Sequence, residues 1–204
     1  MIGLLPGRER QAVRSLPRVH RDVDDLHVAD AARSQAPAAA VFGRQRSTSP
    51  RATIDLDSAD GKIRVGGIGG CYGPSDYERR SKDLQSRAKR HFTRDEVERM
   101  CGRRGVDVLL LHDAPGGVEF TWRRADGSVR RRYQSEAEGL AQAVVGTRPR
   151  ICFFGHHHTR VHTEVAGIQC IGLNKVAMPG NLVALDMPAR GRGYEILGEW
   201  PRPE

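Results

Sequence analysis

The chain has 204 residues, enough for one domain with its own hydrophobic core, and no apolar run approaches the roughly 20 residues of a membrane-spanning helix. Its formal net charge of +8 is compatible with nucleic-acid binding. Only four of its 33 basic residues are lysines, however, and we interpret this arginine excess as GC-rich codon usage. Nucleic acid is therefore a possible partner but not the favoured one.

The four cysteines are widely spaced and form no CxxC pair, so neither a zinc ribbon nor a disulfide framework is indicated. The first residues, MIGLLPGRER, contain too short an apolar stretch for a signal peptide. We therefore expect a cytoplasmic protein with reduced thiols and no membrane contact.

Residues 1–50 show no sustained helical or strand periodicity, and residues 35–50 form a run of low hydrophobicity that ends in Arg-Ser-Thr-Ser-Pro. This composition predicts a poorly structured N-terminal tail, followed by a single domain over residues 51–204.

The domain opens with a predicted strand over residues 62–68, which runs into a cluster of glycines. Further on, Thr93 and Glu96 have the spacing of a capping box. This spacing predicts a helix over residues 94–102.

Two short apolar runs, residues 106–111 and 151–154, have the length and composition of strands that are buried on both faces of a sheet. Between them, Ser135 and Glu138 offer a second capping box, for a helix that Gly146 is placed to end. A strand, helix, strand unit crosses over right-handedly, so we expect the two strands to be parallel.

The last fifty residues are predicted to be β-structure. Residues 161–165 and 168–172 flank Ala166-Gly167, a plausible hairpin turn. Residues 181–186 and 194–200 are further strand candidates.

Both apolar strands end in histidines. His112 follows the first strand, and the run His156-His157-His158 follows Gly155 after the second. Because ligands bind at the carboxyl edge of parallel strands, we expect these two groups to lie side by side. In an extended segment, alternation would place His156 and His158 on one side and His157 on the other.

Neutral imidazoles are good ligands for zinc, iron, manganese and nickel. We therefore predict that His112, His156 and His158 hold two divalent metal ions roughly 3.5–4 Å apart. Asp113 would accept a hydrogen bond from one of these ligands. A structural interpretation stands beside this one, in which the histidines are solvated or capping residues and Asp113 is an ordinary loop residue.

Three segments resemble the calcineurin-like metallophosphoesterases: VGGIGGCY (residues 65–72), residues 90–115 with the pattern LLxHxxP, and FGHHH (residues 154–158). The resemblance covers about residues 54–187. It implies an α/β fold in which a mixed β-sandwich is flanked by helices in four layers, αββα. It also implies that His112 and His156 bind one metal ion and His158 binds the other.

The acidic motifs of that family's front half, D-x-H, G-D-x-x-D and G-N-H, are not found in order. Asp25-Leu26-His27 matches D-x-H in letters but follows no apolar strand, and Gly180-Asn181-Leu182 lies after the histidine run. We therefore expect an incomplete domain, from a truncated or frame-shifted gene, whose catalytic residues are unknown.

The sequence thus favours a metal-dependent phosphoesterase that uses a dinuclear site to hydrolyse phosphomonoesters or phosphodiesters. One alternative is an inactive remnant that acts as a weak metal-binding or interaction module. Another is a basic nucleic-acid-binding protein, which would bind with a steep dependence on salt and without metal.

Overall fold

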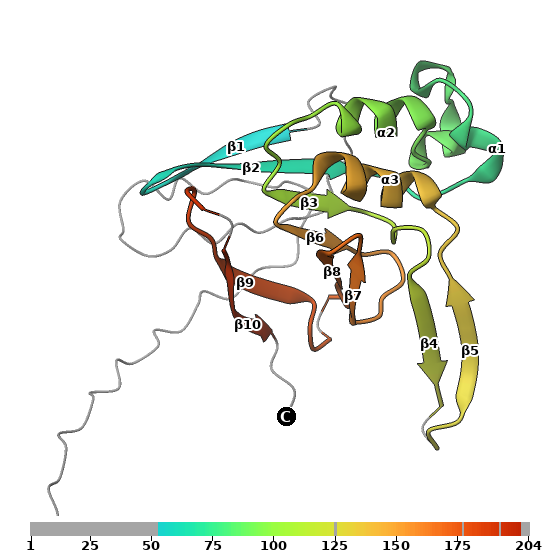
Figure 1. Ribbon diagram of the computed structural model, residues 1–204. Helices are drawn as coiled ribbons and strands as arrows, with labels where there is room; N and C mark the ends of the chain where they lie inside the picture. Colours follow the sequence, from blue (N-terminus) through green and yellow to red (C-terminus); the bar gives the residue numbers. More distant parts are fainter. Residues whose placement is uncertain (1–52, 125, 177, 192, 201–204) are drawn as a thin grey trace, which may run out of the picture. The chain divides into compact units, whose positions relative to one another are not determined.

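The computed structural model describes residues 53–200, apart from 125, 177 and 192 (Figure 1). The predicted tail over residues 1–50 and Asp25-Leu26-His27 lie outside the described residues. A six-stranded mixed sheet forms the centre of the described part. In order across the sheet, its strands are β1 (Thr53–Ser58), β2 (Gly61–Ile68), β3 (Val108–Leu111), β6 (Ile151–Phe154), β8 (Ile168–Gly172) and β7 (Val161–Val165).

The four inner strands β2, β3, β6 and β8 run parallel, while β1 and β7 pair antiparallel at the two edges. The inner strands β3 and β6 read VLLL and ICFF, and nearly every residue in them is buried. Apolar side chains on both faces are stable only between two covering layers, so these strands occupy the middle of the sheet. The predicted parallel pairing of these two runs is confirmed.

Two helices connect the parallel strands. Helix α2 (Arg94–Cys101) begins with the predicted capping box, in which Thr93 and Glu96 satisfy each other's backbone amides. Helix α3 (Glu138–Thr147) has Ala137 as its N-cap residue instead of Ser135, so the second predicted capping box is wrong. The hydroxyl of Ser135 is engaged in the preceding loop, where it donates to the carbonyl of Ala114 at 2.8 Å.

The other elements are short. They are the helix α1 (Pro74–Tyr77), the 3₁₀ turns at Ser81–Asp83 and Ser86–Arg90, the hairpin of β4 (Glu119–Arg123) and β5 (Val129–Gln134), and the hairpin of β9 (Leu182–Asp186) and β10 (Glu195–Trp200). The hairpin β7–β8 and the strands β9 and β10 agree with prediction. Strand β1 and the β4–β5 hairpin were not predicted from the sequence.

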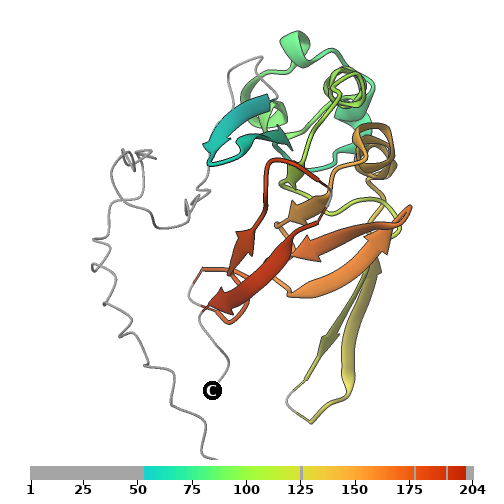
Figure 2. The same ribbon diagram turned by 60° about the vertical axis from the view of Figure 1, so that its left-hand side comes forward.

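The two faces of the central sheet are covered differently (Figure 2). Leu109, Leu111 and Phe154 pack in a core with helices α2 and α3. Their neighbours Val108 and Phe153 point to the opposite face, where they pack with residues of the β9–β10 hairpin. This alternation along each strand is the direct consequence of the two-residue period of β-structure.

The mixed α/β fold is therefore confirmed, with a large sheet, a small sheet on one face and helices on the other. Among residues 53–200, no helix covers the outer face of β9–β10, so the predicted four-layer order is not confirmed (Figures 1 and 2). None of the helices in this part of the chain is long and apolar enough to cross a membrane.

Candidate metal centre

Three potential metal ligands meet at the carboxyl edge of three neighbouring strands. Cys71 lies just beyond the end of β2, His112 directly follows β3, and His156 follows β6. These strands are adjacent in the order β2, β3, β6 and run parallel. Their ends therefore deliver all three side chains to one place.

The donor atoms of Cys71, His112 and His156 all lie within 4.8 Å of one another. The Cys71 Sγ is 3.5 Å from the His156 Nδ1, and the His112 and His156 ring centroids are 5.2 Å apart. Cys71 is half-buried, while both histidines are exposed. The group is thus assembled inside the fold on one side and open to solvent on the other.

These distances fit a transition-metal ion. In a tetrahedral zinc site with Zn–S about 2.3 Å and Zn–N about 2.0 Å, the sulfur and nitrogen atoms are about 3.5 Å apart. The observed Cys71–His156 separation of 3.5 Å agrees with that edge. Three protein ligands leave a fourth position for water or substrate, the arrangement of catalytic zinc sites. A thiolate with two imidazoles favours zinc over manganese.

The histidine loop is not the extended segment that we predicted. His156 and His158 both have left-handed backbones, with φ of 63° and 53°, and the His157 amide donates to the Gly155 carbonyl at 2.7 Å. The alternation expected of an extended segment therefore does not apply to this turn, and the placement of His156 and His158 on one side stays a prediction. His158 is not in the group formed by His112 and His156. Its predicted role as a ligand to a second ion stays a prediction.

His157 is turned into the protein. Its Nε2 lies 2.9 Å from Asp113 Oδ1, and its ring stacks on Phe120 with centroids 4.1 Å apart. These two contacts of the His157 ring fix the loop to the protein, and they thereby hold the adjacent His156 in place.

Asp113 links the two segments that flank this anchor. Its side chain is 9% exposed, and it accepts hydrogen bonds from the His157 ring and from the backbone amides of Tyr72 and Ala114. Tyr72 follows Cys71, and His157 follows His156. Asp113 was predicted to orient a ligand directly, and these bonds show it holding the residues next to two ligands.

The contacts of Asp113 determine its charge. Burial by itself raises the pKa of Asp113, but the hydrogen bonds from His157, Tyr72 and Ala114 outweigh it and lower the pKa below its usual value. Asp113 is therefore an anion at neutral pH.

The pKa values of the two candidate ligands near Asp113, His156 and Cys71, shift in opposite directions. Desolvation lowers the pKa of His156, although Asp113 opposes this, and His157 and His158 lower the pKa further. His156 is therefore neutral near pH 7, as a metal ligand must be. Desolvation and Asp113 both raise the pKa of Cys71, so its thiol holds a proton until a metal ion displaces it. A raised pKa also argues against Cys71 as a free nucleophile, because reactive cysteines have lowered values.

Cys71 was not predicted as a ligand, because the sequence offered no second cysteine at metal-binding spacing. The sequence feature that points to Cys71 is the cluster of glycines directly before it, at the end of the predicted strand 62–68. Gly70 has φ of +89°, and a Cβ there would lie 2.6 Å from the Arg90 carbonyl oxygen. This glycine lets the chain turn at the edge of the sheet and bring Cys71 back toward His156.

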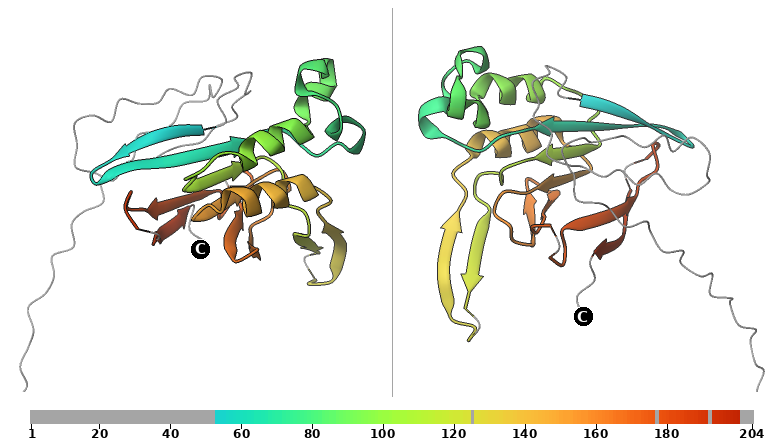
Figure 3. Two further views of the ribbon diagram at one scale, coloured as in Figure 1. Left: turned by 45° about the horizontal axis from the view of Figure 1, so that its top comes forward. Right: turned by 180° about the vertical axis from the view of Figure 1, so that it is seen from behind.

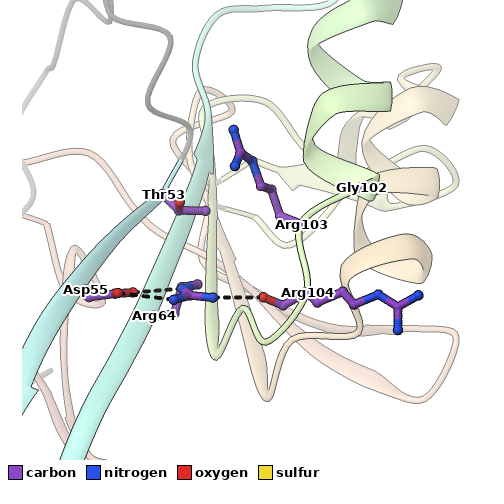
Figure 4. A pocket seen from close by; sticks show the side chains of 6 residues that line it. All are labelled: Thr53, Asp55, Arg64, Gly102, Arg103 and Arg104. Atoms are coloured by element: carbon purple, nitrogen blue, oxygen red, sulfur yellow. Dashed lines mark hydrogen bonds and ion pairs between the residues drawn. The ribbon is translucent and has the colours of Figure 1, made fainter.

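A hollow of about 400 Å³ lies elsewhere, near the start of β3 (Figure 4). Arg64 forms an ion pair with Asp55 at 2.8 Å there, and also donates to the Arg104 carbonyl. This hollow lies at the amino ends of the parallel strands, so it is separate from the candidate metal centre.

No family model matches this sequence, and no curated protein matches it. Among solved structures, the crystal structure of TT1561 of Thermus thermophilus is similar, with 11% sequence identity and a TM-score of 0.38. The match covers 71% of this chain and 55% of that chain. A likeness this distant does not establish a family.

Proposed function

We propose that this chain is a metal-dependent hydrolase of phosphoric esters. The observation that carries the proposal is the convergence of Cys71, His112 and His156 at the carboxyl edge of three adjacent parallel strands. The motifs around His112 and His156 that resemble calcineurin-like phosphoesterases support the same function. We also propose that the complete domain has the four-layer fold of that family.

In this proposal Cys71, His112 and His156 hold one divalent ion, for which zinc is the best fit. When bound, the ion supplies a Lewis acid for a phosphoryl oxygen and a water of lowered pKa. The protein fixes the positions of the three donor atoms. Asp113 does this by binding both Tyr72, next to Cys71, and His157, next to His156. The second ion of the predicted pair would need His158 as a ligand. The number of metal ions bound per chain tests whether that second ion is present.

A second candidate is metal binding without turnover. Among the described residues, the three-donor group contains no carboxylate, and one thiolate leaves a divalent ion with a net positive charge. Such an ion suits an anionic phosphate ester, but equally a structural or storage role.

Metal analysis of the purified chain, followed by hydrolysis of bis-(p-nitrophenyl) phosphate with added zinc or manganese, separates the two candidates. We expect one bound ion per chain and metal-dependent release of nitrophenolate. The His156→Ala variant should lose both. His158→Ala is a matched control, because it places alanine at an equally left-handed position, and it should keep the first ion.

Several outcomes would change the conclusion. Two ions per chain in the native protein and one in His158→Ala would restore the predicted dinuclear site. Bound zinc with no hydrolysis of mono- or diesters would favour the second candidate. Hydrolysis that survives in His156→Ala would rule out this site as the source of activity.

A further inference from the structure

The β4–β5 hairpin carries five exposed arginines and extends away from the central sheet (Figure 3). They are Arg123, Arg124, Arg130, Arg131 and Arg132. Arginines gathered in this way on a projecting two-stranded ribbon form a basic surface that attracts polyanions.

These arginines are not neutralised by the protein. Within the described residues, none of the five forms an ion pair with a carboxylate, and the acidic residues on the hairpin are Glu119 and Asp126. Arg123 and Arg124 donate only to backbone carbonyls and to a serine hydroxyl near the turn. Their positive charges therefore remain available to a ligand.

Aromatic rings stand beside these charges. The Arg131 guanidinium lies 5.5 Å from the Trp122 ring centroid and 5.9 Å from that of Tyr133. On the ribbon, Arg132 and the half-buried Tyr133 border the same hollow of about 540 Å³. Both rings are partly buried and also stack on Phe120, so part of each ring remains exposed beside the arginines. A cation for phosphate next to an aromatic ring is the combination that binds single strands.

The base of the hairpin packs against the loop that carries His156. Phe120 stacks on His157 at 4.1 Å, and the Trp122 Nε1 donates to the Thr159 Oγ1 at 2.9 Å. Both His157 and Thr159 belong to the loop that carries His156. A strand lying along the ribbon would therefore reach, at the base of the ribbon, the loop that carries His156.

From these observations we propose that the β4–β5 hairpin binds single-stranded nucleic acid through its phosphates. Binding by the hairpin is independent of metal. Only the further step, that the bound strand is the substrate, rests on the proposed function. A single strand is favoured over a duplex because the ribbon offers an aromatic ring beside its cations, and bases inside a duplex cannot stack on it.

The test is fluorescence anisotropy of the full chain with labelled oligothymidine and oligouridine of about 20 nucleotides, in EDTA so that no hydrolysis occurs. The variant is Arg130→Ser/Arg132→Ser, since neither side chain makes a hydrogen bond or ion pair with the described residues whose loss would unfold the hairpin. The control is Arg103→Ser/Arg104→Ser, which removes the same charge from exposed positions at the amino ends of the strands (Figure 4).

We expect binding that weakens steeply with salt. Each phosphate contact contributes about 0.7 to the slope of log affinity against log salt, so the hairpin variant should lose about 1.4. Over one decade of salt this is roughly a 25-fold loss of affinity at the low-salt end. The control should keep the native slope, and binding of either oligonucleotide supports the proposal.

Three results would overturn it: no binding by the native chain, equal loss in the hairpin and control variants, or tighter binding of a duplex of the same length. Binding to phosphatidylserine vesicles, abolished in the hairpin variant and without any nucleic-acid binding, would identify a membrane surface instead. Because the assay contains EDTA, failure of the proposed hydrolysis does not affect its outcome. Conversely, hydrolysis of small esters with no strand binding would leave the proposed function standing alone.

Discussion

At the scale of single residues, we expect zinc binding at this centre to require loss of the thiol proton of Cys71. Its pKa is raised by desolvation and by Asp113, so the thiol is protonated at neutral pH and the ion must displace that proton. His156 does not compete in this range, because its pKa is lowered and its ring is neutral. We predict that zinc affinity rises about tenfold per pH unit between pH 7 and 8, as expected for one proton released per ion.

Isothermal titration with zinc in buffers of different ionisation enthalpy measures that proton count. The Cys71→Ser variant should bind zinc more than about 100-fold more weakly and release no proton, because a hydroxyl does not ionise here. Affinity that is flat with pH in the native chain, or unchanged in Cys71→Ser, would remove Cys71 from the set of ligands.

At the scale of elements, the turn after β2 decides where Cys71 is placed. Gly70 has a left-handed φ of +89°, and a Cβ there would meet the Arg90 carbonyl oxygen at 2.6 Å, whereas a Cβ on Gly69 would meet nothing within 4 Å. We predict that Gly70→Ala lowers the free energy of unfolding by more than about 1–2 kcal/mol, the usual cost of a left-handed residue with a Cβ. It should also weaken zinc binding, because the turn that presents Cys71 is displaced.

Gly69→Ala is the matched control for this substitution. Urea denaturation should show a change within about 0.5 kcal/mol for Gly69→Ala, since nothing stands in the way of its methyl group. If Gly70→Ala were as stable as Gly69→Ala and bound zinc normally, the turn would not be what positions Cys71.

The two predicted capping boxes show what element-scale signals can and cannot determine. Thr93 and Glu96 are local partners, and the helix begins where they predict. Ser135 and Glu138 have the same spacing, but Ser135 donates to the Ala114 carbonyl, 21 residues away, and Ala137 is the N-cap residue of the helix. A local motif therefore holds only when no distant group competes for the same hydroxyl.

At the scale of the whole described domain, Arg150 ties the central sheet to the β9–β10 layer. Its side chain is 8% exposed, lies 3.7 Å from Asp107, and donates to the carbonyls of Pro188, at 2.6 Å, and Gly193. Both carbonyls belong to the connection between β9 and β10. The small sheet is thus held on the large one by polar contacts at its edge as well as by its apolar core.

We predict that Arg150→Ala lowers the free energy of unfolding by about 2–3 kcal/mol, as expected when hydrogen bonds from a charged group are lost. Hydrogen exchange should rise first in β9 and β10, because they lose their edge contact with the sheet. Arg104→Ala removes an exposed arginine and should change stability by less than about 0.5 kcal/mol. Equal effects of the two substitutions would mean that Arg150 is not what joins the layers.

The sequence by itself determined the parallel core and the edge at which His112 and His156 meet. Apolar runs such as residues 108–111 and 151–154 can be buried only between two layers, and the helical crossover between them sets their direction. A histidine just beyond the end of each run must then lie at the same edge. These conclusions need only local patterns and one rule of handedness.

Only the tertiary structure decided which side chains share that edge. Cys71 joins the two histidines because the turn at Gly70 brings it across β3, and His157 faces inward because Asp113 and Phe120 hold its ring. The left-handed residues His156 and His158 flank this anchored His157. Contacts between segments far apart in the chain leave no local pattern, so the third candidate ligand and the shape of the histidine loop could not be predicted from sequence.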